Sequence, residues 1–316
     1  MLRPPAYVPL PEGAGPGVLA RDLGETRIGP ATFRWGARTY LMGIVNVTPD
    51  SFSGDGIMAP AGAAPASRAP GSAPASAKPL SVVEVAVARA RRMVAEGADI
   101  LDIGGESTRP GAPPVDEPEE LRRVVPVVRA VREALPAVPI SVDTTKPGVA
   151  EASLDAGANL LNDTWGTGSS DAIARIAAGR DVPLLIMHNR REARYVNVVA
   201  EVIADLQRSI ERAVAAGVPW DHIIVDPGMG FGKTPEQNLA LLHDLAALRL
   251  LGRPVLLGMS RKSTVGIVLG LPVTERLEGT LATTALGVAA GVDIVRVHDV
   301  EPNSRVARMC DAIVRR

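Results

Sequence analysis

Polar and charged residues recur at the ends of short apolar runs along this chain, and they are its first candidates for chemistry. If these runs are parallel strands of one barrel, their carboxyl ends meet at one mouth, where such barrels carry their active sites. The residues at or shortly after the ends of the runs are Asn46, Arg109, Asp143, Asn162 with Asp163, His188, Asp226, Lys262, and Arg296 with His298. The sequence therefore predicts one polar cavity that eight strand ends supply.

Two carboxylates and an ammonium group stand out in this set. Asp143, Asp226 and Lys262 would share the cavity, and isolated charges are costly to desolvate unless they pair with each other or with a ligand. Carboxylates form paired, charge-assisted hydrogen bonds with planar groups that carry adjacent N–H donors. A heterocycle with an amidine-like edge is one ligand of this kind.

A second group of residues suggests a subsite for an anion. Arg109, Arg296 and His298 suit phosphate oxygens, and Asn46 and Asp50 could help to hold a hydrated Mg²⁺. One alternative is that Arg296 and His298 point into the mouth only to satisfy internal acidic groups. Another is that a single Asp or Asn at a strand end merely caps the next helix, and Asp50 fits that interpretation.

Three familiar motifs are absent. The segment from Gly228 to Thr234 looks like a phosphate-binding loop, but that motif needs glycine where the chain has Pro227. Its glycines are better explained by positive φ angles or by close approach to a ligand. The four histidines lie far apart without partner cysteines, which argues against a structural zinc site, and no Gly-x-Ser-x-Gly motif indicates a hydrolase.

The elements that must position these residues alternate between strand-like and helix-like stretches, which is typical of βα units. Apolar spacing of three and four, as in Val198, Val202 and Leu206, indicates the helices. Eight units predict a (β/α)₈ TIM barrel, since an open doubly wound sheet would have a glycine-rich turn after its first strand. The predicted strands are Tyr40–Val45, Ile100–Ile103, Ile140–Val142, Leu160–Leu161, Leu184–Met187, Ile223–Val225, Val255–Met259 and Ile294–Val297.

The rest of the chain divides around this barrel. Residues 1–30 form a Pro/Gly-rich leader without an apolar period, and residues 31–316 form the single barrel domain. Within that domain, residues 57–80 read as a flexible insertion rich in alanine and proline.

Composition restricts the classes of partner. The 316 residues carry 34 basic and 35 acidic side chains, which argues against binding to nucleic acid or to a membrane surface. Cys310 is the only cysteine and cannot form an internal disulfide, so we expect a cytoplasmic protein. The start of the chain has prolines where a signal peptide needs an apolar run, and no stretch is long and apolar enough to span a membrane.

Six blocks stand in order between residues 39 and 300, at the spacing of a barrel. They are Met42–Ser53, Gly97–Gly111, Ile140–Pro147, Asp226–Lys233, Gly258–Lys262 and Arg296–Val300. Together they resemble dihydropteroate synthase, within the pterin-binding barrel superfamily. That family condenses 6-hydroxymethyl-7,8-dihydropterin pyrophosphate with 4-aminobenzoate, with Mg²⁺, to give dihydropteroate and pyrophosphate in folate synthesis. The resemblance also implies a homodimer packed through barrel helices, for which Leu281, Leu286, Val288 and Ile313 are candidates. The same residues could equally face the barrel, and the sequence does not decide between the two.

The resemblance implies a role for each matching residue. The pterin would be held by Asp143, Asn162, Asp226 and Lys262, with Met187 and Phe231 also lining the substrate site. The pyrophosphate would be held by Asn46, Arg109, Arg296 and His298, with Asn46 reaching the metal. The 4-aminobenzoate pocket would be formed in part by Phe52, Thr108, Pro110 and Ser263. Asp143, Asp226, Lys262 and Arg109 would be the catalytic residues.

Two departures from the family pattern keep other functions open. The first loop reads Gly54-Asp55, which displaces the usual aspartate by one residue, and His188 is followed by Asn189 in place of methionine. A methyltetrahydrofolate:corrinoid methyltransferase module would explain the pterin residues but not the anion subsite. A pterin-binding paralogue without turnover is a third possibility, and release of pyrophosphate from the two substrates separates all three.

Overall fold

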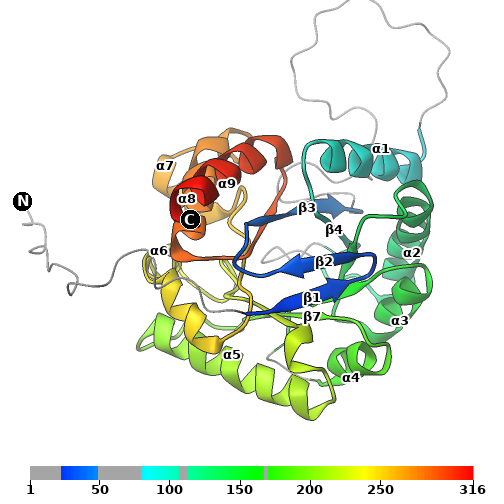
Figure 1. Ribbon diagram of the computed structural model, residues 1–316, viewed down its shortest axis with the longest axis horizontal. Helices are drawn as coiled ribbons and strands as arrows, with labels where there is room; N and C mark the ends of the chain where they lie inside the picture. The colour runs from blue at the N-terminus through cyan, green and yellow to red at the C-terminus, as the bar shows by residue number, and fades with distance from the viewer. Residues whose placement is uncertain (1–22, 49–79, 107–112, 167–169, 316) are drawn as a thin grey trace, which may run out of the picture.

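Eight parallel strands follow one another around a barrel (Figure 1). The computed structural model describes residues 23–48, 80–106, 113–166 and 170–315. The barrel strands are β3 (Tyr40–Asn46), β4 (Ile100–Gly104), β5 (Ile140–Asp143), β6 (Leu160–Asp163), β7 (Leu184–Met187), β8 (Ile223–Asp226), β9 (Leu256–Leu257) and β10 (Ile294–Val297). Their order in the sheet is β8-β7-β6-β5-β4-β3-β10-β9, and a parallel bridge between Val225 and Val255 joins the two edges. The predicted TIM barrel is confirmed.

One strand is shorter than the sequence predicts. We expected Val255–Met259, but β9 covers only Leu256–Leu257. It pairs with β10 through these two residues, and the N–H groups of Asp293 and Ile294 both donate to the carbonyl of Val255. The chain leaves the ladder at Gly258, because β9 lies at the seam where the barrel closes through a single bridge.

Helices cover the outside of the barrel (Figure 1). They are α1 (Val82–Ala95), α2 (Glu117–Ala134), α3 (Pro147–Asp155), α4 (Ala172–Gly179), α5 (Val198–Ala215), α6 (Pro235–His243), α7 (Ser263–Leu269), α8 (Leu277–Ala290) and α9 (Val300–Val314), with short 3₁₀ turns η2 (Trp220–His222), η3 (Leu245–Leu251) and η4 (Val273–Glu275). Capping boxes fix two starts: Ser81 pairs with Glu84 before α1, and Thr234 with Gln237 before α6. None of the described helices is long and apolar enough to cross a membrane.

Side chains alternate between the two faces of each barrel strand, because successive residues point to opposite sides. In β10, Val295 and Val297 pack between the barrel and the helices, whereas Ile294 packs inside the barrel. The inner apolar cluster includes Met42, Ile100, Leu160, Leu185, Ile224, Leu256 and Ile294. Two residues further along most of these strands, the inward positions hold polar side chains. The barrel is therefore apolar at the amino ends of its strands and polar at the carboxyl ends.

A hairpin closes the apolar end and begins before the predicted domain boundary. Strands β1 (Glu25–Ile28) and β2 (Ala31–Arg34) pair antiparallel and cross the end of the barrel (Figure 1). Ile28, Phe33 and Trp35 join the inner apolar cluster. Gly29 and Pro30, which made this segment look like a leader, form the turn of the hairpin, so the ordered fold starts before residue 31. Residues 1–22 of the predicted leader and residues 57–79 of the predicted insertion lie outside the described residues.

Candidate active site

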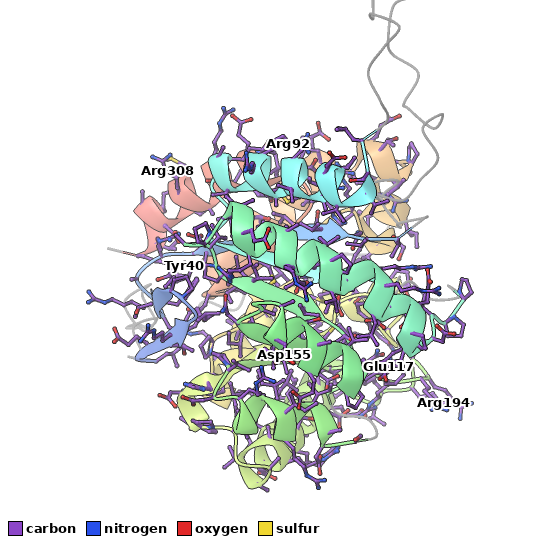
Figure 2. The ribbon with its side chains drawn as sticks, turned by 90° about the vertical axis from the view of Figure 1, so that its right-hand side faces the viewer. Tyr40, Arg92, Glu117, Asp155, Arg194 and Arg308 are labelled. Carbon is purple, nitrogen blue, oxygen red and sulfur yellow. The ribbon has the colours of Figure 1, made fainter. Side chains whose placement is uncertain are left out.

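The polar mouth lies at the end of the barrel away from the hairpin. In Figure 2, Tyr40, next to the hairpin, lies toward one end of the molecule, whereas Glu117, at the start of α2, and Arg194, after β7, lie toward the other. Because the barrel strands are parallel, all of their carboxyl ends meet at that second end. Asp143 and Asp226, the last residues of β5 and β8, are both buried there.

Arg296 is the hub of the charged groups in the mouth. Its Nε donates to Oδ2 of Asp102 (2.6 Å), and its Nη2 donates to Oδ2 of Asp143 (3.0 Å). Nδ2 of Asn162 donates to the same oxygen of Asp102 (3.2 Å). Four strands, β4, β5, β6 and β10, are joined in this way inside the barrel. Arg296 therefore contacts two internal acids through two of its N–H donors.

Burial and charge shift the pKa values of this group. Burial raises the pKa of Asp143 to about 7, with the charge of Arg296 opposing the rise and those of Asp102 and Glu120 adding to it. Burial works to lower the pKa of Arg296, but the two aspartates keep it above its ordinary value. Asp143 can therefore change its charge near neutral pH, whereas Arg296 stays positive.

Asp226 and Lys262 form the opposite wall of the mouth. A methyl group on Gly258 would lie 3.8 Å from Oδ2 of Asp226 and 3.9 Å from Nζ of Lys262, so both charged groups border the same glycine. Burial raises the pKa of Asp226, opposed first by Lys262. Burial lowers the pKa of Lys262 to about 8, opposed by Asp226. The charges of Asp226 and Asp143 both act on Lys262 to raise its pKa, so the two carboxylates and the ammonium group lie near one another.

The remaining described candidates occupy different places around this mouth. Met187, at the end of β7, is buried and lies in register with Asp226. The ring of Phe231 lies with its centroid 4.5 Å from Nζ of Lys262. Nδ1 of His298 lies 2.9 Å from Oγ of Ser260. Ser263 is exposed at the first position of α7, and Asn46 is half-buried at the end of β3.

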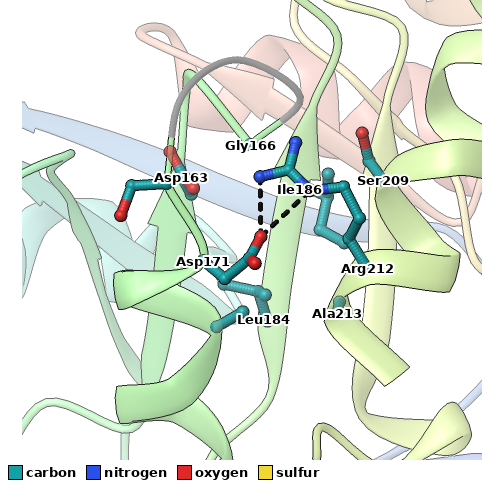
Figure 3. Close-up of a pocket in the computed structure, with 10 residues that line it drawn as sticks. Asp163, Gly166, Asp171, Leu184, Ile186, Ser209, Arg212 and Ala213 are labelled. Atoms are coloured by element: carbon teal, nitrogen blue, oxygen red, sulfur yellow. Dashed lines mark hydrogen bonds and ion pairs between the residues drawn. The ribbon is translucent and has the colours of Figure 1, made fainter. Parts of the chain in front are cut away.

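Asp163 does not belong to the mouth, contrary to the prediction from its place at a strand end. It follows the inward-facing Asn162, so its side chain points outward into a small cavity between α4 and α5 (Figure 3). Burial raises its pKa to about 6, and one carboxylate oxygen accepts from the N–H of Trp165 (3.0 Å). Across this cavity Arg212 donates to Asp171 through Nε (2.9 Å) and Nη2 (2.6 Å). The cavity is part of the helix packing.

The comparisons with known proteins agree with this geometry. A family model described as pterin binding enzyme matches residues 70–298. The dihydropteroate synthase of Clostridium beijerinckii is 47% identical to this chain over 291 residues, which are 92% of this chain and 100% of that protein.

This chain belongs to the dihydropteroate synthase family. Solved dihydropteroate synthases share its fold. That of Clostridium difficile, solved in the presence of pteroic acid, is 45% identical with a TM-score of 0.79 and covers 90% of this chain and 100% of its own. That of Xanthomonas albilineans, in complex with 7,8-dihydropteroate, is 35% identical with a TM-score of 0.78 and covers 92% of this chain and 98% of its own. The resemblance that the six sequence blocks predicted is confirmed.

Several residues that the dihydropteroate synthase pattern implies lie outside the described residues: Phe52, Asp55, Thr108, Arg109 and Pro110. The described residues beside them share one carboxylate. Oε1 of Glu106 accepts from the N–H of Val115 (3.2 Å), and Oε2 accepts from Nζ of Lys146. Lys146, the residue before α3, also donates to the buried Glu120 of α2 (2.5 Å). Glu106 is thus linked to Val115 and, through Lys146, to α2.

Sequence reasoning missed one polar residue of the mouth, Asp102. Asp102 is fully buried, and its Oδ1 has no hydrogen-bond partner within the part of the chain that the structure describes. A carboxylate oxygen in that state is an acceptor that a ligand N–H can satisfy. Asp102 stands inside the apolar run Ile100–Ile103, and an acid at an inward position of a buried strand was the signal that could have identified it.

Proposed function

We propose that this chain is a transferase that condenses 6-hydroxymethyl-7,8-dihydropterin pyrophosphate with 4-aminobenzoate, forming 7,8-dihydropteroate and pyrophosphate in folate synthesis. The observation that carries the proposal is the polar set at the barrel mouth, in which Asp102, Asp143, Asn162 and Asp226 are buried and the half-buried Lys262 lies beside Asp226. The family supports it, because relatives of this chain were solved with pteroic acid present and in complex with 7,8-dihydropteroate.

The buried set matches the edge of a pterin. A pterin carries adjacent N–H donors, and a carboxylate pairs with such donors as it does with a guanidinium group. Asp143 and Asp226 accept these bonds from opposite walls, and Asn162 can both donate and accept. Lys262 donates to the acceptor atoms of the ring. A buried polar group without a hydrogen-bond partner costs free energy. The site therefore selects a pterin over ligands that leave these groups without partners.

The reaction breaks the C–O bond between the pterin methylene and pyrophosphate and forms a C–N bond to the amine of 4-aminobenzoate, which then releases a proton. A neutral aromatic amine is already a nucleophile and needs no strong base. We propose a dissociative course in which positive charge grows on the methylene and negative charge on the pyrophosphate. Asp143 and Asp226 stabilise the first charge, and Arg109, Arg296 and His298 stabilise the second.

Arg296 has two tasks in this proposal. Its contacts with Asp102 and Asp143 use the Nε and Nη2 groups. A guanidinium group has five N–H donors in a planar fork, so it can bind both carboxylates and still donate to an anion. Arg296 thus links the subsite for the pterin to the subsite for the leaving group.

We propose that Mg²⁺ assists through Asn46. Within residues 23–48, 80–106, 113–166 and 170–315, no group of three or more His, Cys, Asp or Glu side chains could hold a metal by itself. Mg²⁺ typically keeps several waters and binds through one or two protein oxygens together with substrate phosphates. The amide oxygen of Asn46, at the end of β3, fits such a site. When bound, the ion would neutralise charge on the pyrophosphate.

The 4-aminobenzoate pocket stays a prediction. Of its proposed residues, only Ser263 is described, at the start of α7 and next to Lys262. Phe52, Thr108 and Pro110 are proposed to complete the pocket.

We also propose a homodimer through α7, α8 and α9, which lie side by side (Figure 1). Their exposed apolar side chains are Ile267, Val268, Leu269, Leu286, Met309 and Ile313. Of the residues predicted for this interface, Leu286 and Ile313 are exposed, Leu281 is half-buried, and Val288 is buried against the barrel. Apolar clusters of this kind commonly mark protein interfaces. The cytoplasmic location predicted from the single cysteine stays a prediction.

A steady-state assay tests the function. Purified protein with Mg²⁺ and both substrates should release pyrophosphate and dihydropteroate in equal amounts. Lys262→Ala should lower kcat/KM at least about 100-fold, because it removes a charged donor from the site, whereas Arg92→Met on the exposed face of α1 should leave it unchanged. Binding of the pterin without either product would instead indicate a non-catalytic paralogue, and methyl transfer from methyltetrahydrofolate to a corrinoid would indicate the other class of barrel.

A further inference from the structure

The loop between β8 and α6 is pressed directly against the residues that follow β7. Gly228, Gly230 and Gly232 all have positive φ angles, of 64°, 78° and 55°. A Cβ atom on Gly228 would lie 1.8 Å from the carbonyl oxygen of His188, and one on Gly232 would lie 2.1 Å from that of Arg190. The glycines are therefore required by the backbone conformation and by close approach to other backbone.

Lys233, at the end of this loop, folds back on it. Its Nζ donates to the carbonyl oxygens of Gly228 (2.9 Å) and Phe231 (3.0 Å) and lies 2.9 Å from Nδ1 of His188. In its charged form Lys233 has three N–H donors, and these three acceptors use all of them. Burial lowers the pKa of Lys233 to about 7, opposed by the charge of Asp226. Lys233 thus ties both halves of its own loop to the neighbouring strand end.

The hydrogen bonds of His188 determine which of its nitrogens carries the proton. His188 is fully buried, and its Nε2 lies 3.0 Å from Oδ2 of Asp205, an oxygen that also accepts from Nε of Arg190 (2.7 Å). A carboxylate paired with arginine only accepts, so Nε2 carries the proton and the lone pair of Nδ1 faces Lys233. Burial and the charge of Lys233 lower the pKa of His188 to about 3, in agreement with a neutral ring.

The loop that Lys233 fixes is the surface on which Lys262 rests. Nζ of Lys262 donates to the carbonyl oxygen of Met229 and lies over the ring of Phe231, with 4.5 Å to its centroid. A Cβ on Gly230 would lie 3.2 Å from Cδ of Lys262. The side chain of Lys262 is thus in contact with three consecutive residues of the loop.

We propose that Lys233 is a positioning residue for the pterin subsite, which holds the carbonyl of Met229 and the ring of Phe231 so that Lys262 stays beside Asp226. The inference rests on the proposed function, because it assigns Lys233 to the pterin and not to 4-aminobenzoate. It also explains why the glycine-rich segment before Lys233 resembles a phosphate-binding loop without being one. The N–H donors of Lys233 bind groups of the protein and not a phosphate.

The test compares Lys233→Met, which keeps the length of the side chain but loses its donors, with Lys233→Arg, which keeps charge and donors. Calorimetry measures the Kd of dihydropterin pyrophosphate in the presence of Mg²⁺, and steady-state kinetics measures the Michaelis constant for the amine substrate, 4-aminobenzoate. Lys233→Met should weaken pterin binding at least about tenfold, as expected for loss of a buried charged donor. The Michaelis constant for the amine substrate should change less than about twofold, and Lys233→Arg should recover part of the pterin affinity.

The inference would be overturned if folded Lys233→Met bound the pterin as tightly as wild type does. It would also be overturned if the Kd of the pterin and the Michaelis constant for 4-aminobenzoate rose by the same factor. If wild-type protein binds the pterin without turnover, the proposed function fails while the comparison of Kd values still tests Lys233. ¹⁵N NMR of the histidines covers the case in which Lys233→Met does not fold. The resonance that His188→Gln removes should show a neutral ring protonated at Nε2 from pH 5 to pH 8, and a ring protonated at Nδ1 would contradict the arrangement.

Discussion

Replacing Arg296 with methionine tests the charged core of the mouth. The change leaves Asp102, fully buried, and Asp143, 7% exposed, without the cation that both of them contact. Removing one partner of a buried ion pair typically costs about 3–5 kcal/mol, because an uncompensated charge remains. At roughly 2–4 °C for each kcal/mol, this corresponds to a loss of roughly 6–20 °C in Tm.

The loss of Tm in Arg296→Met should increase as the pH rises. The pKa of Asp143 is about 7 in the folded protein against an ordinary 3.8, so its contribution to stability is complete below pH 3.8 and is lost as the pH rises through 7. Without Arg296, which works to lower this pKa, Asp143 takes up its proton at a still higher pH. The Tm deficit of Arg296→Met should therefore be larger at pH 8.5 than at pH 5.5.

Differential scanning fluorimetry at the two pH values measures the effect, and Arg92→Met serves as the control. Arg92 pairs with Glu96 on the exposed face of α1, with 66% of its side chain exposed, so its loss should cost at most about 0.5 kcal/mol. Adding Asp143→Asn to Arg296→Met should restore part of the Tm at pH 8.5, because one uncompensated charge is removed. A deficit no larger than that of Arg92→Met, or one that grows toward low pH, would rule out this role of Arg296.

Three further results are expected. Gly228→Ala should either unfold the protein or lower its stability in a thermal melt several times as much as Gly36→Ala. Both glycines have positive φ, but only a side chain at Gly228 would collide with the carbonyl of His188, so Gly36→Ala should cost only about 1–2 kcal/mol. Equal losses of stability in the two variants would contradict this packing. The kcat/KM for dihydropterin pyrophosphate should fall as the pH drops through 7, because Asp143 then takes up a proton, and Asp143→Asn should lack this limb in the pH profile. Chelation of Mg²⁺ by EDTA should lower kcat at least about tenfold, with recovery on adding excess Mg²⁺, whereas unchanged turnover would exclude the metal role of Asn46.

The sequence predicts the barrel well because each strand is a short apolar run bounded by polar residues. Five of the eight strands begin at the predicted residue and extend one or two residues past the predicted end. One example is Leu160–Asp163, for which the prediction was Leu160–Leu161. The hairpin was missed because Gly29 and Pro30 look like leader composition, although the same residues suit a tight turn. The shortened β9 could not be predicted, because closure of the barrel at its seam depends on contacts distant in the sequence.

The site was predicted less completely than the fold, because the sequence does not show where each side chain points or which group it contacts. The sequence places Asn162 and Asp163 together at a strand end, but alternation along the strand sends only Asn162 into the mouth. Asp102 was passed over because it lies inside an apolar run. The task of Lys233 depends on backbone carbonyls of a folded loop, which no spacing of residue types reveals.

The proposed function requires a pterin to bind among Asp143, Asn162, Asp226 and Lys262 in this barrel. A crystal structure of the chain with 7,8-dihydropteroate is the decisive test. We expect the pterin ring in the mouth, with its N–H edge hydrogen-bonded to the carboxylates and Lys262 donating to a ring acceptor. A product molecule bound elsewhere, with these side chains still paired only to one another, would rule this binding mode out.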